Sequence, residues 1–63
     1  MKTRMKISDC SVRVKLVAEP LGFKTLGTFY KFLKQCNPNA RLYYGGGSSV
    51  DVSTVIRHVE KEN

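Results

Sequence analysis

The chain has 63 residues, of which 41% are hydrophobic and 25% charged, and its formal net charge is +6. This composition is typical of a globular domain and excludes a disordered, collagen-like, coiled-coil or disulfide-scaffold protein. A chain of this length forms at most one small domain with a thin core, which argues against a deep catalytic cavity. We expect a cytoplasmic protein without membrane contact, because the chain has neither an apolar run of roughly 20 residues nor the apolar segment of a signal peptide.

Positive charge is concentrated in the first two thirds of the chain. Residues 1–41 contain nine of the eleven lysines and arginines but only two of the five acidic residues. A basic surface of this kind attracts nucleic acid, an acidic protein or an anionic membrane, and it also simply keeps a small protein in solution. The charge therefore leaves the kind of partner open.

The first 18 residues are predicted to form an arm and a strand. Residues 1–9 show no sustained hydrophobic period, so we expect a flexible basic arm ahead of a single domain over residues 10–63. Residues 11–18 alternate, with apolar side chains on one face and Arg13 and Lys15 on the other. This period of two predicts a half-buried strand.

The next segment changes to a helical period. Its apolar residues fall on one helical face and are Leu26, Phe29, Tyr30 and Leu33. This spacing predicts a helix over residues 25–36, with Thr25 as its N-cap. Gly27 lies in the first turn, where glycine costs up to about 1 kcal/mol relative to alanine, so we expect a packing reason for a small residue there.

The last third of the chain predicts a hairpin followed by a second helix. Residues 40–44 and 49–52 have the pattern of two short strands joined by a glycine-rich turn. Helical spacing then resumes, with Asp51 or Ser53 as the N-cap. The element order β-α-β-β-α predicts an α+β fold in which a small three-stranded sheet is covered on one face by two helices.

Few residues suggest catalysis or metal binding. Cys10, Cys36 and His58 lack the spacing of a zinc site or of a nucleophilic pair, so we expect two free thiols and a solvent-facing histidine. The three glycines from Gly45 to Gly47 lack the Gly-Lys-Ser/Thr ending of a phosphate-binding loop and are typical of a flexible turn. We therefore expect no enzyme activity, no catalytic residue, no metal and no cofactor.

Five segments, taken in their order along the chain, resemble segments of a known protein family. They are Val12–Leu16, Pro20–Phe23, Phe29–Asn37, Arg41–Gly46 and Ser49–Ile56. Together they resemble the first strand, active loop, first helix, second strand and second-helix approach of the histidine-containing phosphocarrier (HPr) family. The resemblance covers about residues 12–59 and implies a truncated HPr fold, because the sequence stops where the family would add a fourth strand and a third helix.

The resemblance implies a scaffold without phosphotransfer. The family's phosphorylated histidine falls at Lys24, its loop arginine at Leu26 and its regulatory serine at Thr54. A protonated lysine does not carry a phosphoryl group as an imidazole does, so we expect no phosphocarrier activity. The positions that correspond to the family's docking surface predict a partner-binding surface made of Phe23, Lys24, Leu26, Thr54 and Arg57.

Two functions follow from these expectations. The first is a non-enzymatic protein that binds and modulates a macromolecular partner, such as a phage or mobile-element inhibitor of a host or bacterial protein. The second is a small basic nucleic-acid-binding protein, in which aromatic rings near positive charge stack on bases. Its contact residues would be Arg13, Lys15, Lys31, Lys34 and Arg41. Strand edges left open by the missing fourth strand also predict a weak homodimer formed through apolar contacts.

Overall fold

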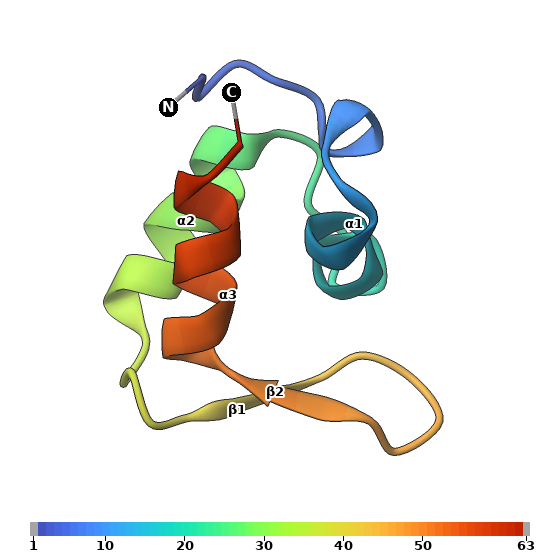
Figure 1. Cartoon of the computed structure of the whole chain (residues 1–63), viewed down its shortest axis with the longest axis vertical. Helices are drawn as coiled ribbons and strands as arrows, with labels where there is room; N and C mark the ends of the chain where they lie inside the picture. Colours follow the sequence, from blue (N-terminus) through green and yellow to red (C-terminus); the bar gives the residue numbers. More distant parts are fainter. Residues whose placement is uncertain (1, 63) are drawn as a thin grey trace.

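The computed structural model describes residues 2–62 and contains three α-helices and one two-stranded hairpin. In chain order the elements are the short 3₁₀-helix η1 (Ile7–Asp9), α1 (Val12–Ala18), α2 (Leu26–Gln35), β1 (Arg41–Tyr43), β2 (Ser49–Asp51) and α3 (Val52–Glu60). The helices α2 and α3 lie side by side, and α1 lies across a central core from them, with the hairpin at one end of the molecule (Figure 1). The fold is α+β, as the sequence predicts, but the sheet has two strands instead of three.

Residues 12–18 form the helix α1, so the prediction of a first strand in this segment is wrong. Val14, Val17 and Ala18 are buried, whereas Val12 and Leu16, which would share a strand face with Val14, are exposed. Burial at i, i+3 and i+4 is the pattern of a helix that packs along one stripe. The β-branched valines favour a strand locally, but packing against η1 and α3 decides the conformation.

The sheet is therefore a single hairpin. Its strands β1 and β2 pair antiparallel, with Leu42 opposite Val50. No strand among residues 2–62 adds to this pair. The first segment of the resemblance to the phosphocarrier family is thus helical, and the structure does not confirm that resemblance.

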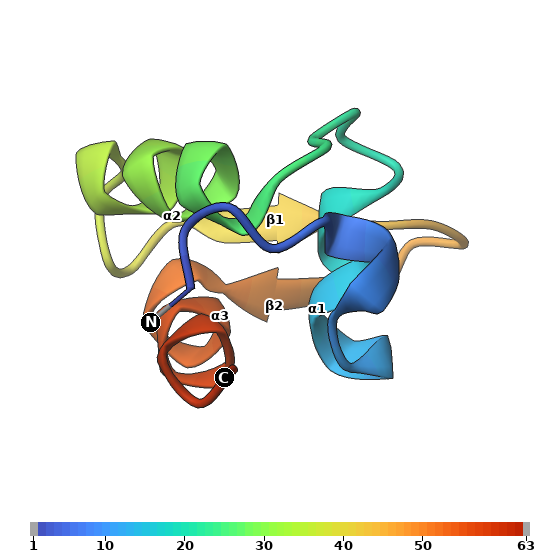
Figure 2. The same cartoon turned by 90° about the horizontal axis from the view of Figure 1, so that it is seen from above.

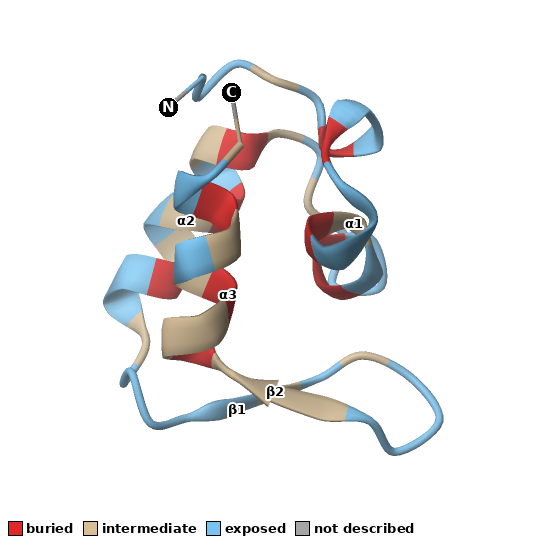
Figure 3. Ribbon diagram, in the orientation of Figure 1, coloured by how far each residue is buried: buried red, intermediate tan, exposed pale blue. Residues whose placement is uncertain are grey.

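The predictions of α2 and α3 are confirmed. Thr25 is the N-cap of α2, and its side-chain oxygen accepts a hydrogen bond from the Thr28 backbone N–H at 3.4 Å. Asp51 occupies the N-cap position of α3. Both helices turn one apolar face inward and leave the other in solvent, as Figure 3 shows by the buried stripe along each ribbon.

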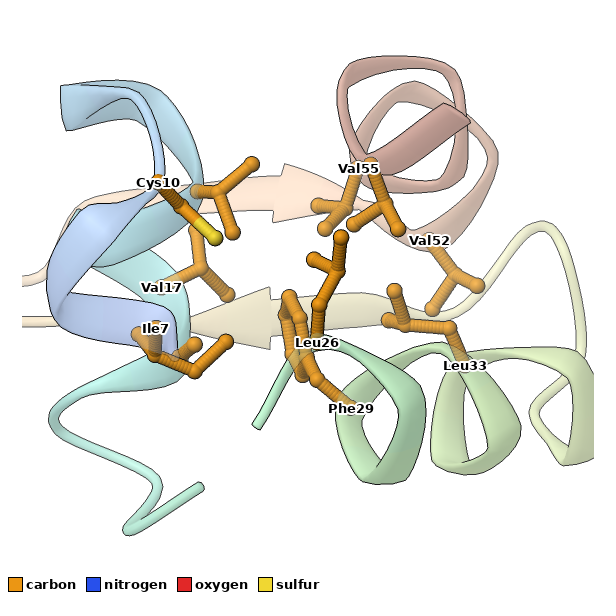
Figure 4. Close-up of a cluster of buried hydrophobic side chains, with 11 residues drawn as sticks. Ile7, Cys10, Val17, Leu26, Phe29, Leu33, Val52 and Val55 are labelled. Carbon is orange, nitrogen blue, oxygen red and sulfur yellow. The ribbon is translucent and has the colours of Figure 1, made fainter. Parts of the chain in front are cut away.

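One apolar cluster holds these elements together. Its side chains come from η1, α1, α2 and α3 and point toward one another across the centre of the molecule (Figure 4). No polar or charged residue in the described part of the chain is buried. The cluster consists of Ile7, Cys10, Val14, Val17, Ala18, Leu26, Phe29, Leu33, Val52, Val55 and Val59.

Residues 2–9 belong to this packed domain, in contrast to the flexible arm expected for residues 1–9, of which Met1 lies outside the described residues. The Ile7 side chain is only 2% exposed. The backbone N–H groups of Leu26 and Gly27 donate to the carbonyl oxygens of Met5 and Thr3, each at 2.8 Å. The chain over residues 2–6, which we call the basic arm, thus crosses the N-terminal end of α2 (Figure 1).

The basic arm supplies the packing reason for Gly27. A Cβ atom at this position would lie 2.7 Å from the Thr3 carbonyl oxygen and 3.0 Å from the Thr3 Cβ. Such a contact is too close for any other residue unless the arm moves. The glycine is therefore required by the arm that crosses it, and not by the helix to which it belongs.

Candidate nucleic-acid interface

The outer face of α2 is basic and polar. Leu26, Phe29 and Leu33 turn the opposite face of the helix into the core. The helix contains no acidic residue, so no carboxylate on α2 offsets its positive charge. The exposed residues on the outer face are Thr28, Lys31, Lys34 and Gln35. Exposed Lys24 lies in the connection that precedes the helix.

One flank of α2 is tied to α3. The Tyr30 hydroxyl donates a hydrogen bond to Glu60 Oε2 at 3.0 Å, and this hydrogen bond raises the pKa of Tyr30. The ammonium of Lys34 lies 5.8 Å from the centroid of the same ring, within the range of a cation–π interaction. Tyr30 therefore belongs to the contact between the two helices, while Lys31 stays exposed to a ligand.

The hairpin presents a second basic and aromatic surface. Arg41 and Tyr43 lie two residues apart on β1, so they share a face, and Tyr43 is 67% exposed. The Arg41 Nη1 donates to Ser49 Oγ at 3.3 Å across the strand pair, which steadies its side chain. Figure 2 shows β1 on the same side of the molecule as α2, with β2 on the side of α3. This places Arg41 on the strand nearer to the lysines of α2.

The tip of the hairpin needs its glycines. Gly45, Gly46 and Gly47 all have positive φ, at 127°, 54° and 85°. The Ser48 N–H closes the turn by donating to the Gly45 carbonyl oxygen at 2.8 Å. Residues with a Cβ rarely adopt such angles, so the turn interpretation of this run is confirmed.

Arg13 and Lys15 do not share a surface, in contrast to the strand-based prediction. On a helix, residues two apart point to different sides. Arg13 lines a groove between α1 and α3, whereas Lys15 does not line it. Of the five predicted nucleic-acid contacts, only Lys31, Lys34 and Arg41 lie on α2 and the adjacent strand.

The predicted partner-binding set is also divided by the fold. Leu26 is fully buried, so its proposed role as a surface contact is wrong. Phe23 packs on Phe29 and Phe32, with ring centroids 5.2 and 5.1 Å apart respectively. Lys24 is exposed beside α2, while the two remaining members of the set lie on α3. They are Thr54, in the groove with Arg13, and Arg57, which is exposed.

The groove between α1 and α3 was not predicted from the sequence. Its floor is apolar, with Leu16, Val17 and Val55 among its lining residues, and Arg13 and His58 line it as well. His58 is half-buried there, in contrast to the solvent-facing position expected for it. Only the helical conformation of α1 brings these residues together, so the groove does not follow from the predicted strand over residues 11–18.

The cysteines contribute no reactive pair. Both thiols are free, and Cys10 is 8% exposed in the core, where burial first and then the Glu62 carboxylate raise its pKa. Within residues 2–62, no three histidine, cysteine or acidic side chains come together as metal ligands would. No helix in that part of the chain is long and apolar enough to cross a membrane.

Comparison with known proteins identifies no relative of this chain. The chain was compared with family models, with curated proteins and with solved structures, and none of them matches it. Any inference about function therefore depends on the surfaces described above.

Proposed function

We propose that this protein binds duplex DNA, with the outer face of α2 in the major groove. The observation that carries the proposal is the face of α2 itself: an exposed row of lysines and amide or hydroxyl side chains without a carboxylate. An α-helix fits the major groove of B-form DNA, whereas the deep and narrow major groove of A-form RNA does not admit one. The basic row therefore favours DNA over double-stranded RNA.

The arrangement of α1 and α2 supports this proposal. In helix-turn-helix proteins the second of two helices enters the major groove, while the first crosses the phosphate backbone. Here α1 and α2 are joined by residues 19–25, in which Gly22 has a φ of 89°. This connection is longer than the usual three or four residues, so the likeness is to a variant of the motif.

The side chains on and beside the row divide into two chemical roles. Lys24 and Lys31 are suited to phosphate oxygens, which position a protein on DNA without reading its sequence. Gln35 and Thr28 are suited to base edges, because an amide pairs with adenine and a threonine methyl packs on the thymine methyl group. Arg41, on the adjacent strand, extends the phosphate contacts beyond the helix.

Fluorescence anisotropy with a labelled mixed-sequence DNA duplex tests this function. The log of the affinity should fall with the log of salt concentration, at a slope of about −0.9 per phosphate contact. Lys31→Glu should weaken binding to every sequence and flatten the slope by about 1. Arg57→Glu makes the same charge change at an exposed position on α3 and is the matched control. It should have a smaller effect on the affinity and on the salt slope. Equal losses in both variants, or binding that ignores salt, would contradict a specific role for α2.

A second candidate function, binding of a protein partner, is favoured by the apolar surface of α1. Val12 and Leu16 are 67% and 52% exposed, and Leu16 also lines the groove between α1 and α3. Arg13 on this groove favours an acidic and apolar segment of the partner. If such a partner exists, Leu16→Ser should abolish its capture from nuclease-treated bacterial lysate, while Lys31→Glu should leave the capture intact.

A further inference from the structure

We propose that the basic arm, residues 2–6, is a second DNA contact that grips the phosphate backbone beside the N-terminal end of α2. The inference rests on the proposed function, because it takes α2 as the helix in the major groove. The arm adds three positive side chains within residues 2–6 and no carboxylate, and all three are exposed. They are Lys2, Arg4 and Lys6.

The arm is held in place by backbone atoms. The Leu26 and Gly27 N–H groups donate to Met5 and Thr3, as described above, and the Ile7 N–H donates to the Lys24 carbonyl oxygen at 2.9 Å. An isolated antiparallel bridge also pairs Lys6 with Thr25. Met5 and Ile7 pack on the core and anchor the segment. Because backbone atoms and apolar side chains hold the arm, its basic side chains remain available to a ligand.

The arm also occupies the place where α2 itself would bind an anion. The unpaired N–H groups at a helix N-terminus attract phosphate. Here the first two of them already donate to arm carbonyls, at Leu26 and Gly27. Phosphate binding at this end of the helix therefore falls to the side chains of the arm.

The positive charge of the arm is continuous with that of α2. Lys6 and Lys24 line one shallow groove between the arm and the connection from α1, in which Glu19 is the carboxylate. Phosphate groups line both sides of the major groove, so a basic segment that crosses one end of a helix in that groove lies within reach of them. The arm should therefore raise the affinity for all sequences without changing which sequence is preferred.

Gly27 is the positioning residue for the arm. Its missing Cβ lets the Thr3 carbonyl approach, and the N–H of the same residue binds that carbonyl. Alanine would favour the helix itself but would displace the arm. The arm's charge and the arm's position can therefore be changed separately in two variants.

The first variant combines Lys2→Ala, Arg4→Ala and Lys6→Ala, which removes charge and keeps the backbone hydrogen bonds. Its control is Lys61→Ala, an exposed lysine that follows α3. With the same labelled duplex, the arm variant should flatten the salt slope by about 0.9 for each phosphate that the arm no longer neutralises. Its preference among duplexes of different sequence should stay that of the unmodified protein.

The second variant, Gly27→Ala, keeps every positive charge but moves the arm. It should lower the affinity and flatten the salt slope as the arm variant does, while circular dichroism shows an unchanged helix content. If the arm variant keeps the wild-type slope and affinity while Lys31→Glu loses binding, the inference about the arm is wrong and the proposed function stands. If the unmodified protein does not bind the duplex, both are wrong.

Discussion

Asp51 shows how one side chain connects the hairpin to the last helix. It is the final residue of β2 and the N-cap of α3, where a negative charge interacts favourably with the helix dipole. A hydrogen bond from its own backbone, followed by one from the Ser53 hydroxyl at 3.1 Å, holds its pKa below the ordinary value of 3.8. The ionised carboxylate therefore stabilises the folded state, and its protonation does not.

We expect Asp51→Asn to destabilise the protein at neutral pH but not in strong acid. Because the pKa is lowered in the folded state, the contribution of Asp51 is fully present above 3.8 and is lost as the pH falls through the folded value. Urea unfolding of both proteins at neutral pH and at a pH well below 3.8 measures the difference. A gap between the two proteins that stays constant across this range would contradict the assignment.

The two thiols should differ in reactivity because their surroundings differ. Cys10 is buried and its pKa is raised, whereas Cys36 is partly exposed at the end of α2. We expect a thiol reagent in mildly alkaline buffer to modify Cys36 quickly and Cys10 slowly. Denaturant should make the two rates alike, and Cys36→Ser should remove the fast phase alone. Two equal rates in the native protein would place Cys10 at the surface.

At the scale of elements, the sequence predicts α2, α3 and the hairpin but not α1. The two predicted helices have a sustained helical period and defined caps at Thr25 and Asp51, and three glycines mark the turn. The segment over residues 11–18 is too short to separate a period of two from a helical one, since Val14 and Ala18 are inward in both. The choice depends on distant partners in η1 and α3, which no local pattern reveals.

The same reason limits what the sequence could show of the candidate site. The exposure of Lys31 and Lys34 follows from the period of α2 and was predictable. The position of the basic arm was not, because it depends on hydrogen bonds from a helix more than 20 residues away to the carbonyl groups of Thr3 and Met5. Gly27 was the one signal, since an unfavourable glycine in a first turn indicates that another part of the chain comes close.

Two substitutions in α1 distinguish a helix from a strand. Val14 is fully buried and Val12 is 67% exposed, although both would lie on the inner face of a strand. We expect Val14→Ala to lower the free energy of unfolding by about 2 kcal/mol, at about 0.8 kcal/mol per buried methylene plus a cavity. Val12→Ala should cost almost nothing, because alanine also favours a helix. Equal losses in chemical denaturation would support the strand instead.

At the scale of the whole molecule, the core is thin and some apolar surface remains outside it. Val12, Leu16, Leu21 and Tyr43 are the large apolar side chains that stay exposed in the described chain. The two strands of the hairpin are only three residues long, so their edges offer little for pairing with another chain. Val12 and Leu16, the two most exposed aliphatic side chains of this group, both lie on α1, so α1 is the surface best suited to self-association.

We expect any homodimer to be weak and to form through Val12 and Leu16. The net charge of +6 repels a second copy, so added salt should strengthen the association. Sedimentation over a wide range of protein concentrations, with and without salt, measures this, and Leu16→Ser should leave only monomer. A dimer that survives Leu16→Ser would point to another surface.

The hydrogen bond between Ser11 and Glu62 has a consequence for the order in which the protein forms during its synthesis. The Ser11 side chain does not cap α1, and the Ser11 backbone N–H donates instead to Glu62 Oε1, 51 residues later. A seven-residue helix is too short to persist alone in water. On the ribosome, α1 emerges well before α3, and therefore before the carboxylate that completes its N-terminus. We therefore expect α1 to become stably helical only after α3 has emerged and can pack against it.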